Sequence, residues 1–177
     1  MSILNEELFK KGKEFEEVIM SKLKNVVDSP QTIESVRSKF ENENADLTND
    51  ELNKLEKRWG DITFMHNEKR WYIECHLAVG EYSTSFCDLK RIMFNGEDKF
   101  YAIGYTNRRT NAAMTKFIRA ETWNKYLAKS PMIRKSNRNY RSIKIDNIDG
   151  LFAAANNESD FVKKFLSNVT KTKDSNI

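Results

Sequence analysis

The stretch that decides the fold spans residues 60–79 and reads GDITFMHNEKRWYIECHLAV. At its start the spacing of apolar residues changes from the period of a helix to the alternation of a strand. In its second half apolar and polar residues alternate, as they do in a strand with one buried face. We therefore expect residues 61–65 and 70–79 to be two strands of a hairpin that turns at residues 66–69.

The register of this hairpin decides where its acidic residues lie. If the turn has two residues, His66 pairs with Lys69, and Asp61 then lies opposite Glu74. Directly opposed residues of an antiparallel pair point to the same face, with Cβ atoms about 5 Å apart. Two carboxylates this close repel each other unless a cation or a proton lies between them, and Mg²⁺ is bound by such oxygens. The register therefore predicts a site for Mg²⁺ or Mn²⁺ at Asp61 and Glu74.

Patterns on either side of the hairpin complete the expected fold. Apolar periodicity predicts helices over residues 6–27, 31–43, 48–58, 110–129 and 160–169. Thr48 and Glu51 have the spacing of a capping box. Further strands are expected over residues 99–105 and 141–145. This order predicts a single α/β domain over residues 1–170, with a mixed central β-sheet flanked by helices, and a disordered tail over residues 171–177.

The composition excludes several classes of protein. Hydrophobic residues make up 39% of the 177-residue chain and charged residues 32%. No run approaches the roughly 20 apolar residues that cross a bilayer, so no membrane partner is expected. Two cysteines are too few for a disulfide scaffold, and the first residues lack the apolar core of a secretory signal. We therefore expect a cytoplasmic protein.

Basic residues are concentrated in the second half of the chain. Between residues 101 and 144 there are eleven lysines and arginines and a single acidic residue, Glu121. Such asymmetry favours a polyanionic partner, and the alternative is a solvated face that complements the acidic N-terminal half. DNA is the expected partner, with RNA as the alternative. The residues expected to contact nucleic acid are Arg108, Arg109, Lys116, Arg119, Arg134, Lys135, Arg138 and Arg141.

The hairpin resembles the core of the PD-(D/E)XK nuclease superfamily, which includes many restriction enzymes, junction resolvases and repair nucleases. In that superfamily an Asp begins one strand and a (D/E)-X-K triplet lies on the next, within a helix–three-strand–helix–strand core. Asp61 matches the first acid and Glu74 the second. Residues 12–19 (GKEFEEVI) are similar to the N-terminal helix pattern G-x-x-F-E-x-x-V, in which Glu16 would be an additional acid. The resemblance covers residues 8–145 and implies a restriction-endonuclease-like core.

The chain departs from the family pattern at one position, because His76 stands where the motif has a lysine. A lysine supplies a fixed positive charge beside the attacking water, whereas a neutral histidine accepts a proton. His76 would therefore act as the proton acceptor, and Lys90 could fold back to supply the missing cation. The resemblance further implies that the backbone carbonyl of Cys75 is a metal ligand, and that Glu16 orients a second metal or its water.

These observations predict a metal-dependent endonuclease that hydrolyses phosphodiester bonds in DNA and uses Mg²⁺ or Mn²⁺. A double-strand cut needs two active sites, so we expect a homodimer for that reaction. The alternative is a catalytically degraded nuclease-fold protein that binds nucleic acid or a protein partner without cutting. A zinc site is disfavoured, because Cys75 and His76 are consecutive in a strand and point to opposite faces.

Overall fold

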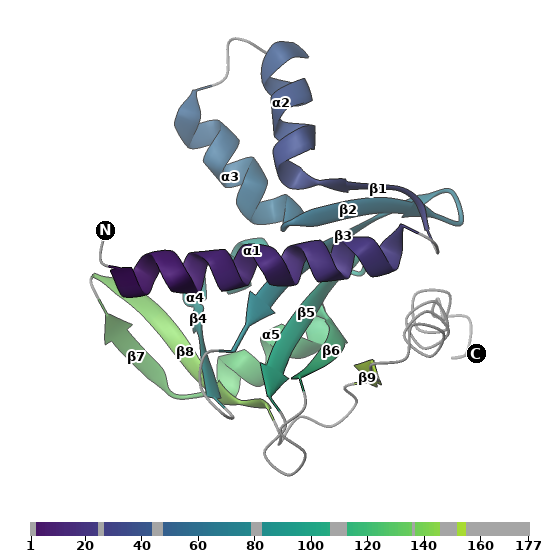
Figure 1. Cartoon of the computed structure of the whole chain (residues 1–177). Coiled ribbons are helices and arrows are strands. Elements are labelled where there is room, and N and C mark those ends of the chain that lie inside the picture. The colour runs from purple at the N-terminus through teal and green to yellow at the C-terminus, as the bar shows by residue number, and fades with distance from the viewer. Residues whose placement is uncertain are drawn as a thin grey trace, which may run out of the picture.

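The computed structural model of the chain describes residues 3–24, 27–43, 48–78, 83–106, 113–135, 137–145 and 152–154 (Figure 1). Within these ranges no helix is both long enough and apolar enough to cross a membrane. The predicted helix over residues 160–169 and the predicted tail over residues 171–177 lie outside the described residues.

A mixed sheet organises the described part of the fold. Its strands lie in the order β1-β2-β3-β5-β6-β9. Strands β3 and β5 run parallel, and the other neighbours run antiparallel. The strands are β1 (Asp28–Thr32), β2 (Ile62–His66), β3 (Lys69–Leu77), β5 (Lys99–Thr106), β6 (Ala113–Arg119) and β9 (Phe152–Ala154). The predicted α/β class with a mixed central sheet is confirmed.

The hairpin of β2 and β3 has the predicted register. Ile62 pairs with Ile73 and His66 pairs with Lys69, so the chain reverses through a two-residue turn at Asn67 and Glu68. Both turn residues have positive φ, 49° and 61°, as a two-residue hairpin turn of this twist requires. Asp61 lies immediately before β2, where the register extends to Glu74.

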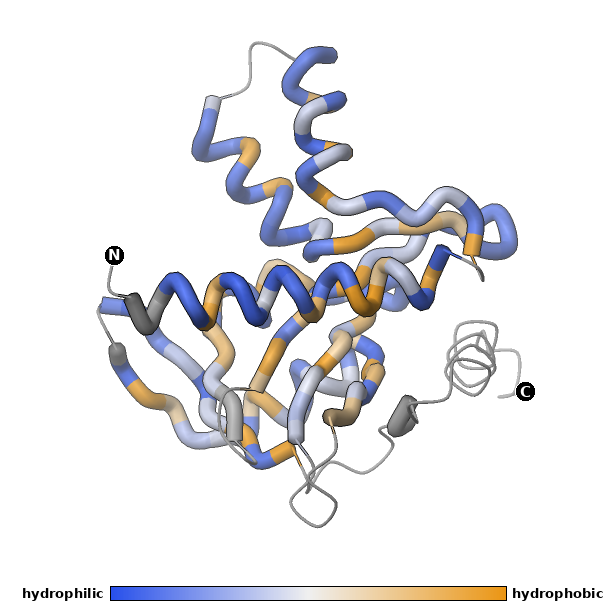
Figure 2. The backbone as a smooth tube through the Cα atoms, in the orientation of Figure 1, coloured by the Kyte–Doolittle hydropathy of each residue, from blue (hydrophilic) through white to orange (hydrophobic). Residues whose placement is uncertain are grey.

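Helix α1 (Ile3–Leu23) covers one face of this sheet and crosses in front of it in Figure 1. Apolar and polar residues alternate along α1 (Figure 2). Ile19 and Leu23 are fully buried against Phe64, Ile73 and other residues of β2, β3, β5 and β6. Burial of these side chains provides the main hydrophobic stabilisation on this side.

A second layer covers the opposite face. It contains α4 (Asp88–Met93), α5 (Ala120–Lys129) and a three-stranded sheet in the order β4-β8-β7. The strands of this smaller sheet are β4 (Ser83–Cys87), β7 (Met132–Lys135) and β8 (Arg138–Lys144). Trp123 of α5 is fully buried with Tyr101 and Ile103 of β5 and with Phe86 of β4.

Two further helices, α2 (Ile33–Glu43) and α3 (Asn49–Trp59), project together from one end of the sheet (Figure 1). The predicted capping box is present, since Thr48 and Glu51 exchange side-chain and backbone hydrogen bonds at the start of α3. The rings of Phe40 and Trp59 pack edge to face at 5.4 Å between the two helices.

The prediction of a helix over residues 110–129 is wrong in its first half, because residues 113–119 form β6. Strand β5 is buried along most of its length, so its backbone groups need partners on both edges. Strand β6 supplies one of these edges and buries Phe117 and Ile118. Tertiary pairing here outweighs the helical pattern.

Two other predictions change. The strand expected over residues 141–145 begins earlier, because β8 spans Arg138–Lys144 and pairs with β7. The first helix ends at Leu23 rather than near residue 27, and Ser29 and Pro30 belong to β1.

Candidate functional site

Asp61 is placed by the turn between α3 and β2. Gly60 ends α3 with φ 73°, and an added Cβ there would lie only 2.7 Å from the carbonyl oxygen of Ile73. The backbone N–H of Asp61 donates to that carbonyl at 2.8 Å, and the backbone N–H of Cys75 donates to Asp61 Oδ2 at 2.7 Å. The Asp61 carboxylate is therefore fixed against the part of β3 that extends beyond the start of β2.

Glu74 lies beside Asp61 and is almost completely buried, with 6% of its surface exposed. Burial and then the charge of Asp61 raise its pKa to about 8. Its Oε1 forms an ion pair with Lys90, whereas its Oε2 has no hydrogen-bond partner among the described residues. Burial likewise raises the pKa of Asp61, although Lys90 and the Cys75 N–H oppose the shift. The Asp61 charge thus opposes ionisation of Glu74 in a site with little water, and at neutral pH Glu74 largely keeps its proton.

Lys90 brings a cation to this acidic pair from α4, a helix that the sequence pattern did not predict. Its side chain is 33% exposed, and its ammonium group contacts Glu74. Burial lowers the pKa of Lys90, but the charges of Glu74 and Asp61 outweigh this effect, and the pKa is raised. Lys90 is therefore charged at neutral pH, and it lies next to Glu74, where it was expected to supply the cation that the motif requires.

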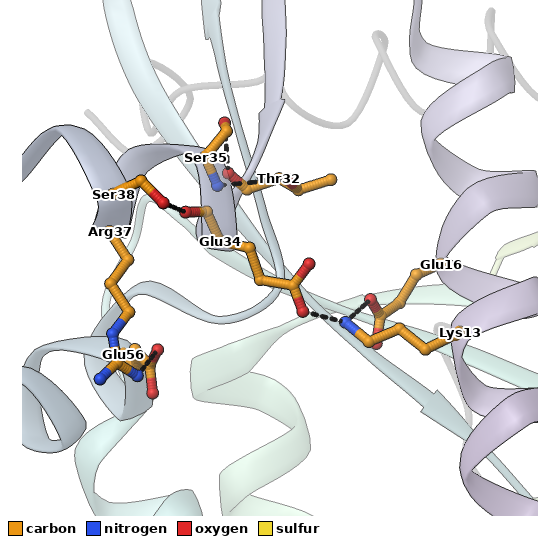
Figure 3. A network of polar contacts seen from close by, with 8 residues as sticks. All are labelled: Lys13, Glu16, Thr32, Glu34, Ser35, Arg37, Ser38 and Glu56. Carbon is orange, nitrogen blue, oxygen red and sulfur yellow. Dashed lines mark hydrogen bonds and ion pairs between the residues drawn. The ribbon is translucent and has the colours of Figure 1, made fainter.

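Glu16 approaches the pair from α1 but is held by other groups. Lys13 donates to Glu16 at 2.9 Å and to Glu34 of α2 at 2.6 Å, which links the two helices (Figure 3). Burial raises the pKa of Glu16, Lys13 opposes the shift, and the nearby charge of Asp61 adds to it. The surroundings of Asp61 and Glu74 thus include a third acid, Glu16, and the two ammonium groups of Lys13 and Lys90.

The donor set fits a hard divalent cation with few protein ligands. Across the described ranges, no three His, Cys, Asp or Glu side chains are grouped to hold a metal ion. Two carboxylates suffice for Mg²⁺, which keeps several waters and takes further oxygens from a substrate phosphate. The raised pKa of both acids and the unpartnered Oε2 of Glu74 indicate that further positive charge would stabilise this pair. Glu16 does not complete a three-acid cluster with them.

The backbone of Cys75 faces Asp61 from β3. Along β3, Ile73 and Cys75 bond toward Asp61, whereas Tyr72 and Ala78 bond toward β5. The N–H and C=O of one strand residue point to the same side, so the Cys75 carbonyl also faces Asp61. This orientation agrees with the predicted role of that carbonyl. Burial, followed by the nearby carboxylates, raises the pKa of the Cys75 thiol, which is therefore protonated.

His76 lies on the same strand face as Glu74, packed against Phe86 of β4 with ring centroids 3.9 Å apart. Burial and then the charge of Lys90 lower its pKa to about 4. The imidazole is therefore neutral at neutral pH, and the burial that lowers its pKa also opposes its taking up a proton. Its role as an acceptor stays a prediction.

The predicted nucleic-acid contacts fall into three groups. Arg108 and Arg109 lie outside the described residues, as does the side chain of Lys135. Arg134 and Arg138 are exposed on the β7–β8 hairpin. The remaining three make contacts within the fold: Lys116, Arg119 and Arg141.

Contacts of these three cations join separate parts of the structure. Arg141 donates to Asp88 at 3.2 Å and to the Ser130 carbonyl at 3.1 Å. Arg119 donates to the Glu97 carbonyl at 3.0 Å, and Lys116 lies 5.0 Å from the ring centroid of Tyr105. All three therefore serve the fold, whether or not they also meet nucleic acid.

Sequence reasoning missed two residues of the site. Lys13 precedes Glu16 by three positions on a helix, a spacing that could have indicated the pair. Tyr101 pairs with Glu74 across β5 and β3, and its buried hydroxyl has no hydrogen-bond partner in the described part of the chain. Burial and then Glu74 raise the pKa of this hydroxyl. No local signal marks Tyr101, because it meets Glu74 only through the parallel pairing.

Comparison with known proteins does not assign the chain to a family. No family model matches the chain, and neither the curated proteins nor the solved structures contain a significant match.

Proposed function

We propose that this chain is a divalent-metal-dependent endonuclease of the PD-(D/E)XK type that hydrolyses phosphodiester bonds in DNA. The observation that carries the proposal is the contact of Lys90 with Glu74 beside Asp61. An acid before one strand, an acid on the next and a lysine at the second acid are the three groups of the motif. The lysine comes from α4 rather than from the position of His76.

The order of elements supports the same proposal. Helix α1 is followed by the antiparallel strands β1, β2 and β3, then by α4 and by β5, which runs parallel to β3. This is the helix–three-strand–helix–strand order that the resemblance implies, with β4, α2 and α3 as additions.

Each residue has a role that follows from its contacts. Asp61, oriented by the Cys75 N–H, and Glu74 would hold the cation together with the Cys75 carbonyl. The chemistry that Mg²⁺ would supply there, if bound, is activation of a water and stabilisation of negative charge on the phosphate. When the carboxylates are so engaged, the Lys90 ammonium is free to donate to a phosphate oxygen and stabilise the charge that develops there. In this proposal His76 accepts the proton of the attacking water, although the burial that lowers its pKa opposes this, and Glu16 orients a second metal or its water.

Cleavage assays test this proposal. Plasmid and single-stranded DNA, and RNA of the same sequence, are incubated with the protein in Mg²⁺ or Mn²⁺. Asp61→Ala and Glu74→Ala should each reduce cleavage by at least about a hundredfold, because each removes a ligand. Glu121→Ala is the matched control, since Glu121 is an exposed acid paired only with Lys125 in the described contacts. Equal cleavage by all four proteins would refute the catalytic proposal.

The alternative, a nuclease fold that binds without cutting, has two observations in its favour. The described residues contain no three-ligand group, and the ring face of His76 packs on Phe86. DNA binding without metal-dependent cleavage would support this alternative. A homodimer stays the prediction for double-strand cleavage, and sedimentation with and without DNA tests it.

A further inference from the structure

A cavity adjoins the acidic pair, Asp61 and Glu74, on the side where Lys90 lies. Its volume is about 490 Å³, and it is lined by residues that include members of α3, α4 and β8. Its volume is within the range of small-ligand sites, roughly 300–1,000 Å³. The residues that matter for its chemistry are Lys57, Leu89, Lys90, Ile92, Asn137 and Arg138.

The charge of the cavity favours an anion. Lys57, Lys90 and Arg138 line it from three elements, α3, α4 and β8. The acid in its lining is Asp88, which is paired with Arg91 at 2.8 Å and with Arg141 at 3.2 Å. These arginines neutralise Asp88, and Lys90 is paired with Glu74. Lys57 and Arg138 therefore present a net positive charge to an incoming ligand.

The same cavity offers apolar surface. Leu89 and Ile92 are three residues apart on α4 and are 52% and 61% exposed. Large aliphatic side chains on a helix are normally turned toward the core, and here the two stand at a cavity that also carries the amides of Asn137 and Asn139. Aliphatic surface beside amide groups suits the faces and edges of a nucleobase.

Lys90 connects the cavity to the acidic pair. Its side chain lines the cavity, and its ammonium group ends at Glu74. A phosphate that binds Lys90 from the cavity therefore lies next to Glu74 and Asp61. A nucleotide in the cavity would then be the neighbour of the phosphate at the site.

We propose that this cavity binds one unpaired nucleotide of the substrate strand, next to the phosphate that is cut, with its base against Leu89 and Ile92. The identification of the ligand as nucleic acid rests on the proposed function. A base in a duplex is stacked and paired on both sides and reaches a pocket only when it leaves the stack. The protein therefore prefers single-stranded DNA, or DNA with an unpaired nucleotide at the cleavage position, over perfect duplex.

Binding is measured by fluorescence anisotropy in EDTA, with a labelled single-stranded oligonucleotide and with the same sequence as a duplex. Arg138→Ala should weaken single-strand binding by about tenfold. Lys144→Ala is the control, because Lys144 is an exposed cation of the same strand, β8, that lies outside the cavity lining. It removes the same charge and should weaken binding by about twofold or less.

Ile92→Ala should weaken binding by about threefold through lost contact with the base. Its control is Val18→Ala, because Val18 is an exposed aliphatic residue of α1, away from the cavity lining. An oligonucleotide with one abasic position should bind the wild type more weakly than the intact strand, and this difference should shrink in Ile92→Ala. Thermal melts of all variants establish that each is folded.

Three outcomes overturn the proposal: equal losses in Arg138→Ala and Lys144→Ala, equal affinity for single strand and duplex, or no effect of Ile92→Ala. The proposed function fails separately. If the cavity variants lose binding as expected while the wild type never cleaves DNA in Mg²⁺, the cavity is a nucleotide site on a protein that does not cut.

Discussion

Replacing Glu74 with Gln should remove a pH dependence from the stability of the protein. In the folded state the pKa of Glu74 is raised to about 8, from an ordinary value of 4.5, by burial and by Asp61. The folded protein therefore holds a proton that the unfolded chain releases. The stabilisation due to this proton is complete below the unfolded pKa and is lost as the pH rises through the folded pKa.

The magnitude follows from the two pKa values. Between them, each pH unit costs the folded state about 1.4 kcal/mol, so a rise from about pH 5.5 to about pH 7.5 costs about 3 kcal/mol. Gln cannot lose a proton, so Glu74→Gln avoids this cost. The variant should become more stable relative to wild type by about 3 kcal/mol over this interval.

Urea unfolding in EDTA, followed by tryptophan fluorescence, to which the buried Trp71 and Trp123 contribute, measures this difference at several pH values. Glu121→Gln is the control, because it makes the same replacement at an exposed carboxyl on the surface of α5. If the difference in unfolding free energy between wild type and Glu74→Gln does not change with pH, the claim that the Glu74 carboxyl is buried beside the charge of Asp61 is refuted.

Three further predictions concern the surrounding structure. Gly60→Ala should cost at least about 2 kcal/mol of unfolding free energy, because the added Cβ meets the Ile73 carbonyl and φ is positive; an unchanged urea midpoint would contradict this. Thr48→Ala should cost about 1 kcal/mol by removing the cap of α3, and Thr48→Ser should recover most of it in the same measurement. Arg141→Ala should lower the thermal midpoint as well as any DNA affinity, because Arg141 bonds to Asp88 and to a backbone carbonyl; weaker DNA binding at unchanged stability would show that its contacts within the fold contribute nothing.

The hairpin could be predicted from the sequence because its information is local. Alternation decided which residues of β3 share a face, and a two-residue turn decided the register, so the amino-acid pattern was enough to pair Asp61 with Glu74. The contact of Lys90 with Glu74 depends on the path between β3 and β5. That path forms β4 and α4, whose positions are set by packing against β8 and β5 rather than by a local pattern.

The structure of residues 113–119, which precede α5, could not be predicted from the local pattern. Residues 113–119 and α5 form one continuous helical pattern, yet the chain changes from strand to helix at Arg119 and Ala120. The deciding factor is the free edge of buried β5, which is known only once the sheet order is known. Tyr101 could not be identified from the sequence for the same reason, because it meets Glu74 only through the pairing of β5 with β3.

Calorimetric titration of the EDTA-treated, dialysed protein with Mn²⁺ tests most directly whether Asp61 and Glu74 form a divalent-cation site. Wild type and Glu121→Gln should bind one ion per chain with the same affinity, and Glu74→Gln should bind at least about tenfold more weakly, because it lacks one of the two carboxylates. Lys90→Met should bind at least as tightly as wild type, because it removes the cation that competes for Glu74. No binding by wild type, or equal binding by wild type and Glu74→Gln, would contradict the account.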